Sequence, residues 1–215
     1  MVNLMKKIPN EHFIKFRDVI KRSLFDDSVF DDCFSDMISA SEDTHNHIKV
    51  YDFPDCNMEA IKLDEYTKDF DQKRRNEMPE LRVNHQPFAV DAICINKDNE
   101  WFLIEFKNQP YTKAVSDSKK KMLSSLWLIG YLYSKLSEKI ADDTDFLKFA
   151  REKVTYITVV SSDKNEDDLE TLGVTWEKDG AFYTPDEFTK YKGYYFKDIY
   201  LLTDLALRFF IELFD

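Results

Sequence analysis

Residues 88–107 read FAVDAICINKDNEWFLIEFK, and this stretch decides the fold. It contains two runs rich in β-branched and aromatic residues, 88–96 and 100–107, which only the polar residues 97–99 separate. Runs of this composition are typical of strands, and a short polar loop between two of them is typical of a β-hairpin. The stretch therefore predicts two antiparallel strands joined by a tight turn.

Three charged residues, Asp91, Glu105 and Lys107, interrupt these apolar runs. Side chains alternate between the two faces of a strand, so Glu105 and Lys107 share one face. If the loop is residues 97–99, with its final asparagine in a left-handed conformation, Asp91 lies opposite Glu105. A two-residue turn would set Asp91 against Phe106 instead. The register of the hairpin therefore decides whether the three charges meet.

The spacing of Glu105 and Lys107 alone carries no weight, because an acid two residues before a lysine also begins at Asp71 and Asp117. The spacing becomes informative because Asp91, on the preceding strand, can lie opposite Glu105. Two carboxylates so close on a partly buried surface repel one another unless a cation lies between them. Mg²⁺ or Mn²⁺, which prefer oxygen ligands, suit that position and can activate a water for phosphodiester hydrolysis. We therefore expect Asp91 and Glu105 to bind a metal, with the Lys107 ammonium beside the reacting groups.

The rest of the chain predicts helices and strands around this hairpin. We expect helices over 12–24, 57–75, 113–138 and 204–214, the last capped by Thr203, and strands over 154–160 and 194–203. The helix over 57–75 has to end before Pro79. The helix over 113–138 is apolar around most of its surface and should be largely buried. The run 154–160 is apolar on both faces, which indicates an interior strand reached by a crossover. This order predicts an α/β (α+β) domain with a mixed central sheet flanked by helices.

The sequence resembles the PD-(D/E)XK nuclease superfamily, which has the restriction-endonuclease-like fold. The matching residues are Asp91 in AVDAICI and Glu105 and Lys107 in LIEFKN. The family's core is a helix, a three-stranded antiparallel unit, a second helix and a further parallel strand, which is similar to the order expected over 57–160. The resemblance implies a nuclease that requires Mg²⁺ (or Mn²⁺) and cuts DNA in preference to RNA. It also implies that Asp91 and Glu105 are the metal ligands and Lys107 the catalytic lysine.

Two features of the family's motif are less definite in this sequence. Val90 stands where the motif's name has proline, which is a common variation. Many members add a glutamate from the first core helix, and both Glu59 and Glu65 are available for that position.

The chain is acidic, with a net charge of −11, but its charge is uneven. The segment 107–121 contains five lysines and a single acid. Lys119, Lys120 and Lys121 are therefore candidate contacts for the phosphates of a nucleic acid. Gln109 is a further candidate, because it lies on the face of the metal site if the strand extends that far.

The chain of 215 residues, 43% hydrophobic, predicts one domain over 1–215. We expect a nuclease-like core over 57–160, with a helical N-terminal and a strand–helix C-terminal extension. No apolar run is long enough for a membrane span, the start lacks a secretory pattern and the three cysteines lack metal-ligand spacing. These features favour a cytoplasmic protein without membrane contact. The acidic charge leaves an alternative function, a catalytically inactive protein of this fold that binds a basic protein partner.

Overall fold

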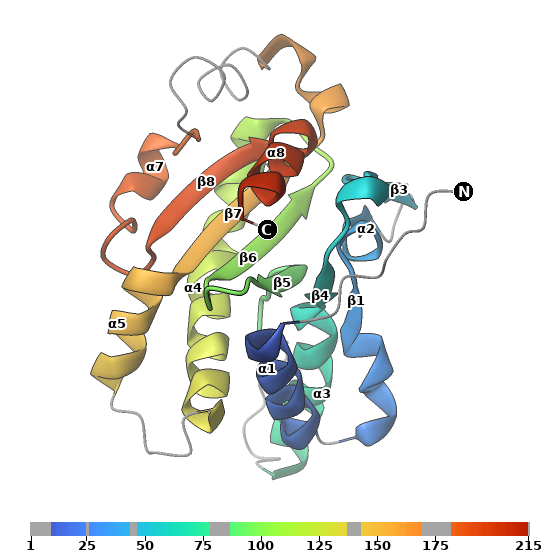
Figure 1. Cartoon of the computed structure of the whole chain (residues 1–215), viewed down its shortest axis with the longest axis vertical. Helices are drawn as coiled ribbons and strands as arrows, with labels where there is room; N and C mark the ends of the chain where they lie inside the picture. Colours follow the sequence, from blue (N-terminus) through green and yellow to red (C-terminus); the bar gives the residue numbers. More distant parts are fainter. Residues whose placement is uncertain are drawn as a thin grey trace.

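A six-stranded sheet forms the centre of the protein in the computed structural model, which describes residues 10–24, 26–43, 47–77, 87–136, 143–168 and 182–214 (Figure 1). The strand order is β1-β4-β5-β6-β7-β8. The strands of this sheet are β1 (Phe34–Asp36), β4 (Glu59–Ile61), β5 (Ala92–Ile95), β6 (Trp101–Lys107), β7 (Val154–Val160) and β8 (Asp198–Thr203). A separate antiparallel pair consists of β2 (Glu42–Asp43) and β3 (Ile48–Lys49).

The main sheet is antiparallel in one half and parallel in the other. Strands β1, β4, β5 and β6 pair antiparallel, whereas β7 runs parallel to both β6 and β8. A parallel pair needs a crossover between its strands, and helices α4 (Tyr111–Leu136) and α5 (Asp143–Lys153) form it between β6 and β7. The expected mixed sheet is therefore confirmed. Strand β7 is buried along its whole length, which confirms the interior strand over 154–160.

Helices cover both faces of the sheet and enclose two apolar cores. The other helices are α1 (Glu11–Ser23), α2 (Met37–Ala40), α3 (Leu63–Glu77), α7 (Asp186–Thr189) and α8 (Asp204–Phe214). Trp101 and Leu103 of β6 belong to the core that includes α1, α3 and α4. Phe102 and Ile104 belong to the core that includes α2 and α8. The expected alternation along β6 is thus confirmed, and it directs Glu105 towards α4.

Side chains fix where α1 and α8 begin. The Oγ1 of Thr203 accepts the N–H of Ala206 at 3.1 Å, which confirms Thr203 as the N-cap of α8. At the start of α1, the side-chain oxygen of Asn10 accepts the N–H of Phe13 at 2.9 Å. The Asn10 amide also donates to the carbonyl of Ile95 at 2.7 Å, so α1 is attached to the end of β5.

Four expectations about these elements are wrong. The expected helix over 57–75 begins only at Leu63, because β4 occupies its first part. The strand expected over 194–203 begins at Asp198, and α5 was not expected at all. The first strand of the hairpin, expected over 88–96, contains only Ala92–Ile95. Helix α4, in contrast, is largely buried as expected, although Trp127 is 56% exposed. Short strands depend on partners that are remote in sequence, and a count of apolar residues does not show which of them find a neighbour.

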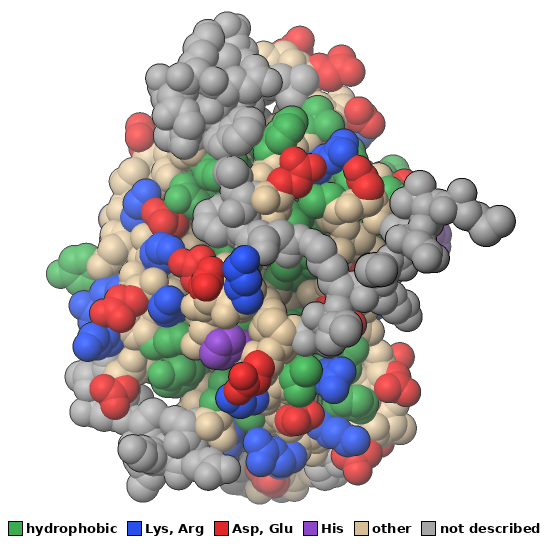
Figure 2. Space-filling model, in the orientation of Figure 1, with side chains coloured by type: hydrophobic (Ala, Val, Ile, Leu, Met, Phe, Trp, Pro, Cys, Tyr) green, Lys and Arg blue, Asp and Glu red, His purple; other side chains and the backbone are tan. Residues whose placement is uncertain are grey.

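Acidic and basic side chains are intermingled on the face drawn in Figure 2. The excess of acids does not form one continuous patch on that face. Within the described ranges, no helix combines the length and apolar character needed to cross a membrane.

Candidate active site

The loop of the central hairpin contains three residues, 97–99. The N–H of Asn96 donates to the carbonyl of Glu100 across this loop at 3.1 Å. Asn99 has a φ of 57°, the left-handed conformation that asparagine tolerates better than most residues. The Asn99 side chain also accepts the indole N–H of Trp101 at 3.0 Å, which holds the turn to the start of β6. The expected three-residue loop is therefore confirmed.

This loop sets the register that brings Asp91 to Glu105. Ala92 pairs with Ile104, so Asp91, one residue before β5, falls at the level of Glu105. The backbone N–H of Phe106 donates to Oδ2 of Asp91 at 2.7 Å and fixes that carboxylate beside β6. The two acids of the hairpin therefore meet as the sequence predicts.

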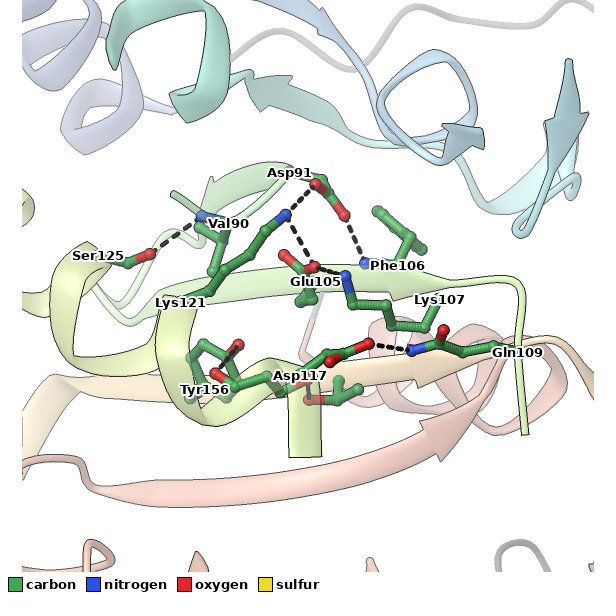
Figure 3. A network of polar contacts seen from close by, with 12 residues as sticks. Val90, Asp91, Glu105, Phe106, Lys107, Gln109, Asp117, Lys121, Ser125 and Tyr156 are labelled. Atoms are coloured by element: carbon green, nitrogen blue, oxygen red, sulfur yellow. Dashed lines mark hydrogen bonds and ion pairs between the residues drawn. The ribbon is translucent and has the colours of Figure 1, made fainter. Parts of the chain in front are cut away.

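Lys121 of α4 lies between these two carboxylates (Figure 3). Its Nζ is 3.0 Å from Oδ1 of Asp91 and 2.8 Å from Oε1 of Glu105. The Nζ of Lys107 also forms an ion pair with Oε1 of Glu105. Two carboxylates and two ammonium groups thus share one site, and Lys121 stands where the sequence predicts a metal ion.

Burial and charge alter the proton affinities in this cluster. Glu105 is fully buried, and burial, followed by the nearby charge of Asp91, raises the pKa of Glu105 to about 7. Lys121 and Lys107 oppose that shift without cancelling it. Burial alone would lower the pKa of Lys121, but Asp91 and Glu105 outweigh it and raise that pKa above its ordinary value. Lys121 is therefore charged at neutral pH, while Glu105 can exchange a proton there.

The second oxygen of the Glu105 carboxylate has no hydrogen-bond partner among the described residues. Oε1 contacts the two lysines, whereas Oε2 is buried and contacts no described donor. A buried acceptor without a partner costs about 1–3 kcal/mol. Together with Asp91, this oxygen is a suitable donor for a hard cation, and Mg²⁺ commonly takes one or two protein carboxylates and completes its shell with water or phosphate oxygens. Among the described residues, no group of three His, Cys, Asp or Glu side chains is arranged to hold a metal.

A third acid, Asp64, lies near Asp91, and the sequence pattern does not predict it. It stands in the first turn of α3, and burial, followed by the charge of Asp91, raises its pKa. Glu65, which was considered for this position, is paired with Lys68 at 2.6 Å. Glu59 is on β4 and lines a different pocket. The placement of Asp64 depends on where α3 begins, and the sequence pattern placed that start too early.

A pocket of about 670 Å³ lies beyond the carboxyl end of β6, and the fully buried Glu105 is not among the residues that line it. Asp64 and Glu65 line it from α3, Asp91 and Lys107 from the hairpin, and Lys121 from α4. Ser41, which follows α2, and Glu42 of β2 also line the pocket. A concave site of this size with converging charged groups has the dimensions of a ligand-binding site.

The candidate nucleic-acid contacts lie in different places. Gln109 lines the pocket and its amide donates to Oδ2 of Asp117 at 3.1 Å. Lys121 is inside the site, as described above, rather than on its rim. Lys119 is half-buried and Lys120 is exposed, and neither lines the pocket. Of the three consecutive lysines 119–121 in α4, only Lys121 therefore belongs to the site.

No family model, curated protein or solved structure matches the chain. The chemistry of the site therefore has to be argued from its own residues. They supply two converging carboxylates, a third acid nearby, and two ammonium groups that face an open pocket.

Proposed function

We propose that this protein is a metal-dependent nuclease of the restriction-endonuclease-like class that hydrolyses phosphodiester bonds in DNA. One observation carries the proposal: Asp91, just before β5, and the buried Glu105 of β6 converge beside Lys107, and Asp91 and Lys107 line a pocket. Bringing two carboxylates together at a partly buried site is costly unless cations compensate them, and this arrangement is suited to holding a metal ion.

The arrangement of the elements supports this class. Strands β4, β5 and β6 form an antiparallel unit, α4 follows, and β7 then lies parallel to β6. This is similar to the core of the PD-(D/E)XK nucleases. Helix α3 lies between β4 and β5 in the chain, whereas α1 is the helix that precedes all four antiparallel strands.

Asp91 and Glu105 would hold Mg²⁺ or Mn²⁺. When bound, such an ion polarises a phosphoryl oxygen and lowers the pKa of a water. Lys107 would place its ammonium against charge that develops on the phosphate. Lys121 would have to leave at least one carboxylate before that carboxylate could bind an ion, since its Nζ contacts both.

The proposal is tested by incubating the purified chain with single- and double-stranded DNA and RNA, with Mg²⁺, Mn²⁺ or EDTA. We expect cleavage of a DNA substrate that EDTA abolishes. Lys107→Ala and Asp91→Asn should each reduce the rate at least about a hundredfold, because the first removes the ammonium at the reacting phosphate and the second removes a metal ligand. Lys190→Ala removes an exposed lysine outside the pocket and should leave the rate unchanged. Absence of metal-dependent cleavage across the whole panel would reject the proposal.

A second function is favoured by a specific observation. Lys121 already neutralises the two carboxylates, and the chain carries a net charge of −11. Both facts fit an inactive protein of this fold that binds a basic protein partner through its acidic surface. In that case Asp91→Asn and Lys107→Ala would leave partner binding intact.

Calorimetric titration with Mn²⁺ separates the two functions. The nuclease requires binding that Asp91→Ala removes. The interaction protein requires no divalent ion, so an equal response of the wild type and this variant would favour it.

A further inference from the structure

Three aromatic side chains form a cluster on the outer side of α3 and α4. Phe70 of α3 contacts the rings of Trp127 and Tyr131 of α4, with centroid distances of 6.1 and 5.4 Å. Trp127 and Tyr131 are stacked, with their ring planes 16° apart. Trp127 is 56% exposed, so part of its ring is available to a ligand. A tryptophan left this open within an aromatic cluster is not explained by packing of the core.

Positive charge lies beside this cluster. A neighbouring pocket of about 260 Å³ is lined by Arg22, Lys73, Tyr131 and Lys135 together with Val19 and Ser23. No acid is among these lining residues, although the chain as a whole is strongly acidic. The Lys135 ammonium lies 5.2 Å from the centre of the Tyr131 ring. Arg22, Lys73 and Lys135 form no ion pair with any described residue.

The same two helices connect this cluster to the candidate active site. Helix α3 lines the active-site pocket with Asp64 and contributes Phe70 to the cluster. Helix α4 lines the pocket with Lys121 and contributes Tyr131. The ten residues from Lys121 to Tyr131 span about 15 Å of helix. A chain that lies along this seam could therefore reach from the cluster to the pocket.

We propose that the α3–α4 surface, formed by Phe70, Lys73, Trp127, Tyr131 and Lys135 with Arg22 of α1, binds single-stranded nucleic acid. A base stacks on the exposed ring of Trp127, which the half-buried rings of Phe70 and Tyr131 support, and the cations without an ion-pair partner neutralise phosphates. In a duplex the bases already stack on one another, so their faces are not available to Trp127. Binding itself requires no cleavage. The identification of the single strand as the substrate rests on the proposed nuclease function.

The test measures the fluorescence anisotropy of labelled single-stranded oligonucleotides in EDTA, where no metal-dependent cleavage occurs. We expect single strands to bind more tightly than a duplex of the same sequence. Trp127→Ala should weaken binding about tenfold through the loss of stacking. Lys73→Glu and Lys135→Glu should each weaken binding and reduce the slope of log affinity against log salt by about one.

Matched controls come from the loop between α7 and β8. Tyr194→Ala removes an aromatic ring that is 72% exposed, and Lys190→Glu reverses an exposed lysine. Both should leave the affinity unchanged. Circular dichroism checks that all variants fold, and loss of Trp127 fluorescence on addition of the oligonucleotide gives a second readout of contact at this ring.

Three results would overturn the inference: unchanged affinity in Trp127→Ala, duplex binding as tight as single-strand binding, or no binding of nucleic acid at all. The absence of nucleic-acid binding is also the result expected if the surface binds a protein partner instead. Oligodeoxythymidylate and oligouridylate are compared to distinguish DNA from RNA, and preferential binding of either supports the proposal. Binding without cleavage in Mg²⁺ would reject the nuclease function and support the single-strand-binding surface. Cleavage without this binding pattern would support the nuclease function and reject the binding surface.

Discussion

Lys121 is the residue whose position differs most from its expected role. The sequence places it in a run of three lysines and predicts an outward phosphate contact. The structure instead inserts it between Asp91 and Glu105, while its neighbour Lys120 is exposed. Adjacent helical residues point in directions about 100° apart, and only the packing of α4 on the sheet decides which one points inwards.

Lys121→Met should destabilise the protein in EDTA by about 3 kcal/mol at about pH 8, because two buried carboxylates lose their shared cation. Addition of Mn²⁺ should recover more stability in this variant than in the wild type, since the competing ammonium is gone. Urea unfolding with and without Mn²⁺ measures both effects. Lys119→Met, on the same helix but outside the pocket, serves as the control. Equal stability of the two variants in EDTA would contradict the prediction.

Glu105 should make stability depend on pH. Its pKa of about 7 in the folded protein lies above the ordinary value of 4.5, so the folded state binds more protons than the unfolded state between these values. Stability therefore falls as pH rises from about 4.5 to 7. Glu105→Gln removes this dependence and should exceed the wild type in stability by up to about 3 kcal/mol above pH 7, with little difference near pH 4.5. Unfolding in EDTA across this range measures it, and parallel pH curves would refute it.

At the level of elements, the hairpin could be predicted because its signals are local. Alternation fixed which side chains share a face, and the asparagine at position 99 suited the left-handed residue of a three-residue loop. The sequence left the register open between a two-residue turn and a three-residue loop, and the structure has the loop that brings Asp91 to Glu105. Half of the candidate site could therefore be predicted from residues 91–107 alone.

The rest of the site depends on contacts between distant segments. Strand β4 is three residues long and exists because β1 and β5 flank it, so a helical pattern over 57–75 hid it. The consequence was a misplaced start for α3, and Asp64 was overlooked. Helix α5 has few apolar residues, and a glycine of α4, Gly130, leaves space for its Phe146 ring. Such fits cannot be inferred from periodicity.

The cap of α8 provides a test at this scale. Thr203→Ala removes the oxygen that accepts the N–H of Ala206 and should lower the free energy of unfolding by about 1 kcal/mol. Thr203→Ser keeps the hydroxyl and should retain most of the stability. Urea denaturation of both variants decides the matter, and an equal loss in the two would assign the effect to packing of the threonine methyl group.

For the whole molecule, the sheet is completed by segments on both sides of residues 57–160, the range in which the sequence predicts the core. Strand β1 precedes that core, and β8 follows it at the other edge. Phe16 of α1 packs on Trp101 at a ring distance of 4.5 Å, and Phe210 of α8 packs on Phe102 at 5.3 Å. Each face of the sheet therefore takes part of its cover from outside the core.

A fragment of residues 57–160 should accordingly fail to fold, because both apolar faces would be exposed to water. We expect no cooperative thermal transition by circular dichroism, in contrast to the full chain. The full-length Phe210→Ala variant tests one of these contacts alone and should lose about 3–5 kcal/mol of stability. A fragment that unfolds cooperatively would show that the flanking segments are dispensable additions.

The three-residue loop at 97–99 also constrains how this protein can vary. Asp98 lies in the loop, six residues before Ile104, so the loop is about 20 Å along the strand from the site. Hairpin tips generally accept insertions and deletions, since they face solvent. Here a gain or loss of one residue would shift every cross-strand pair and separate Asp91 from Glu105. The loop can therefore tolerate replacement of the exposed Lys97 and Asp98 but no change in the number of its residues.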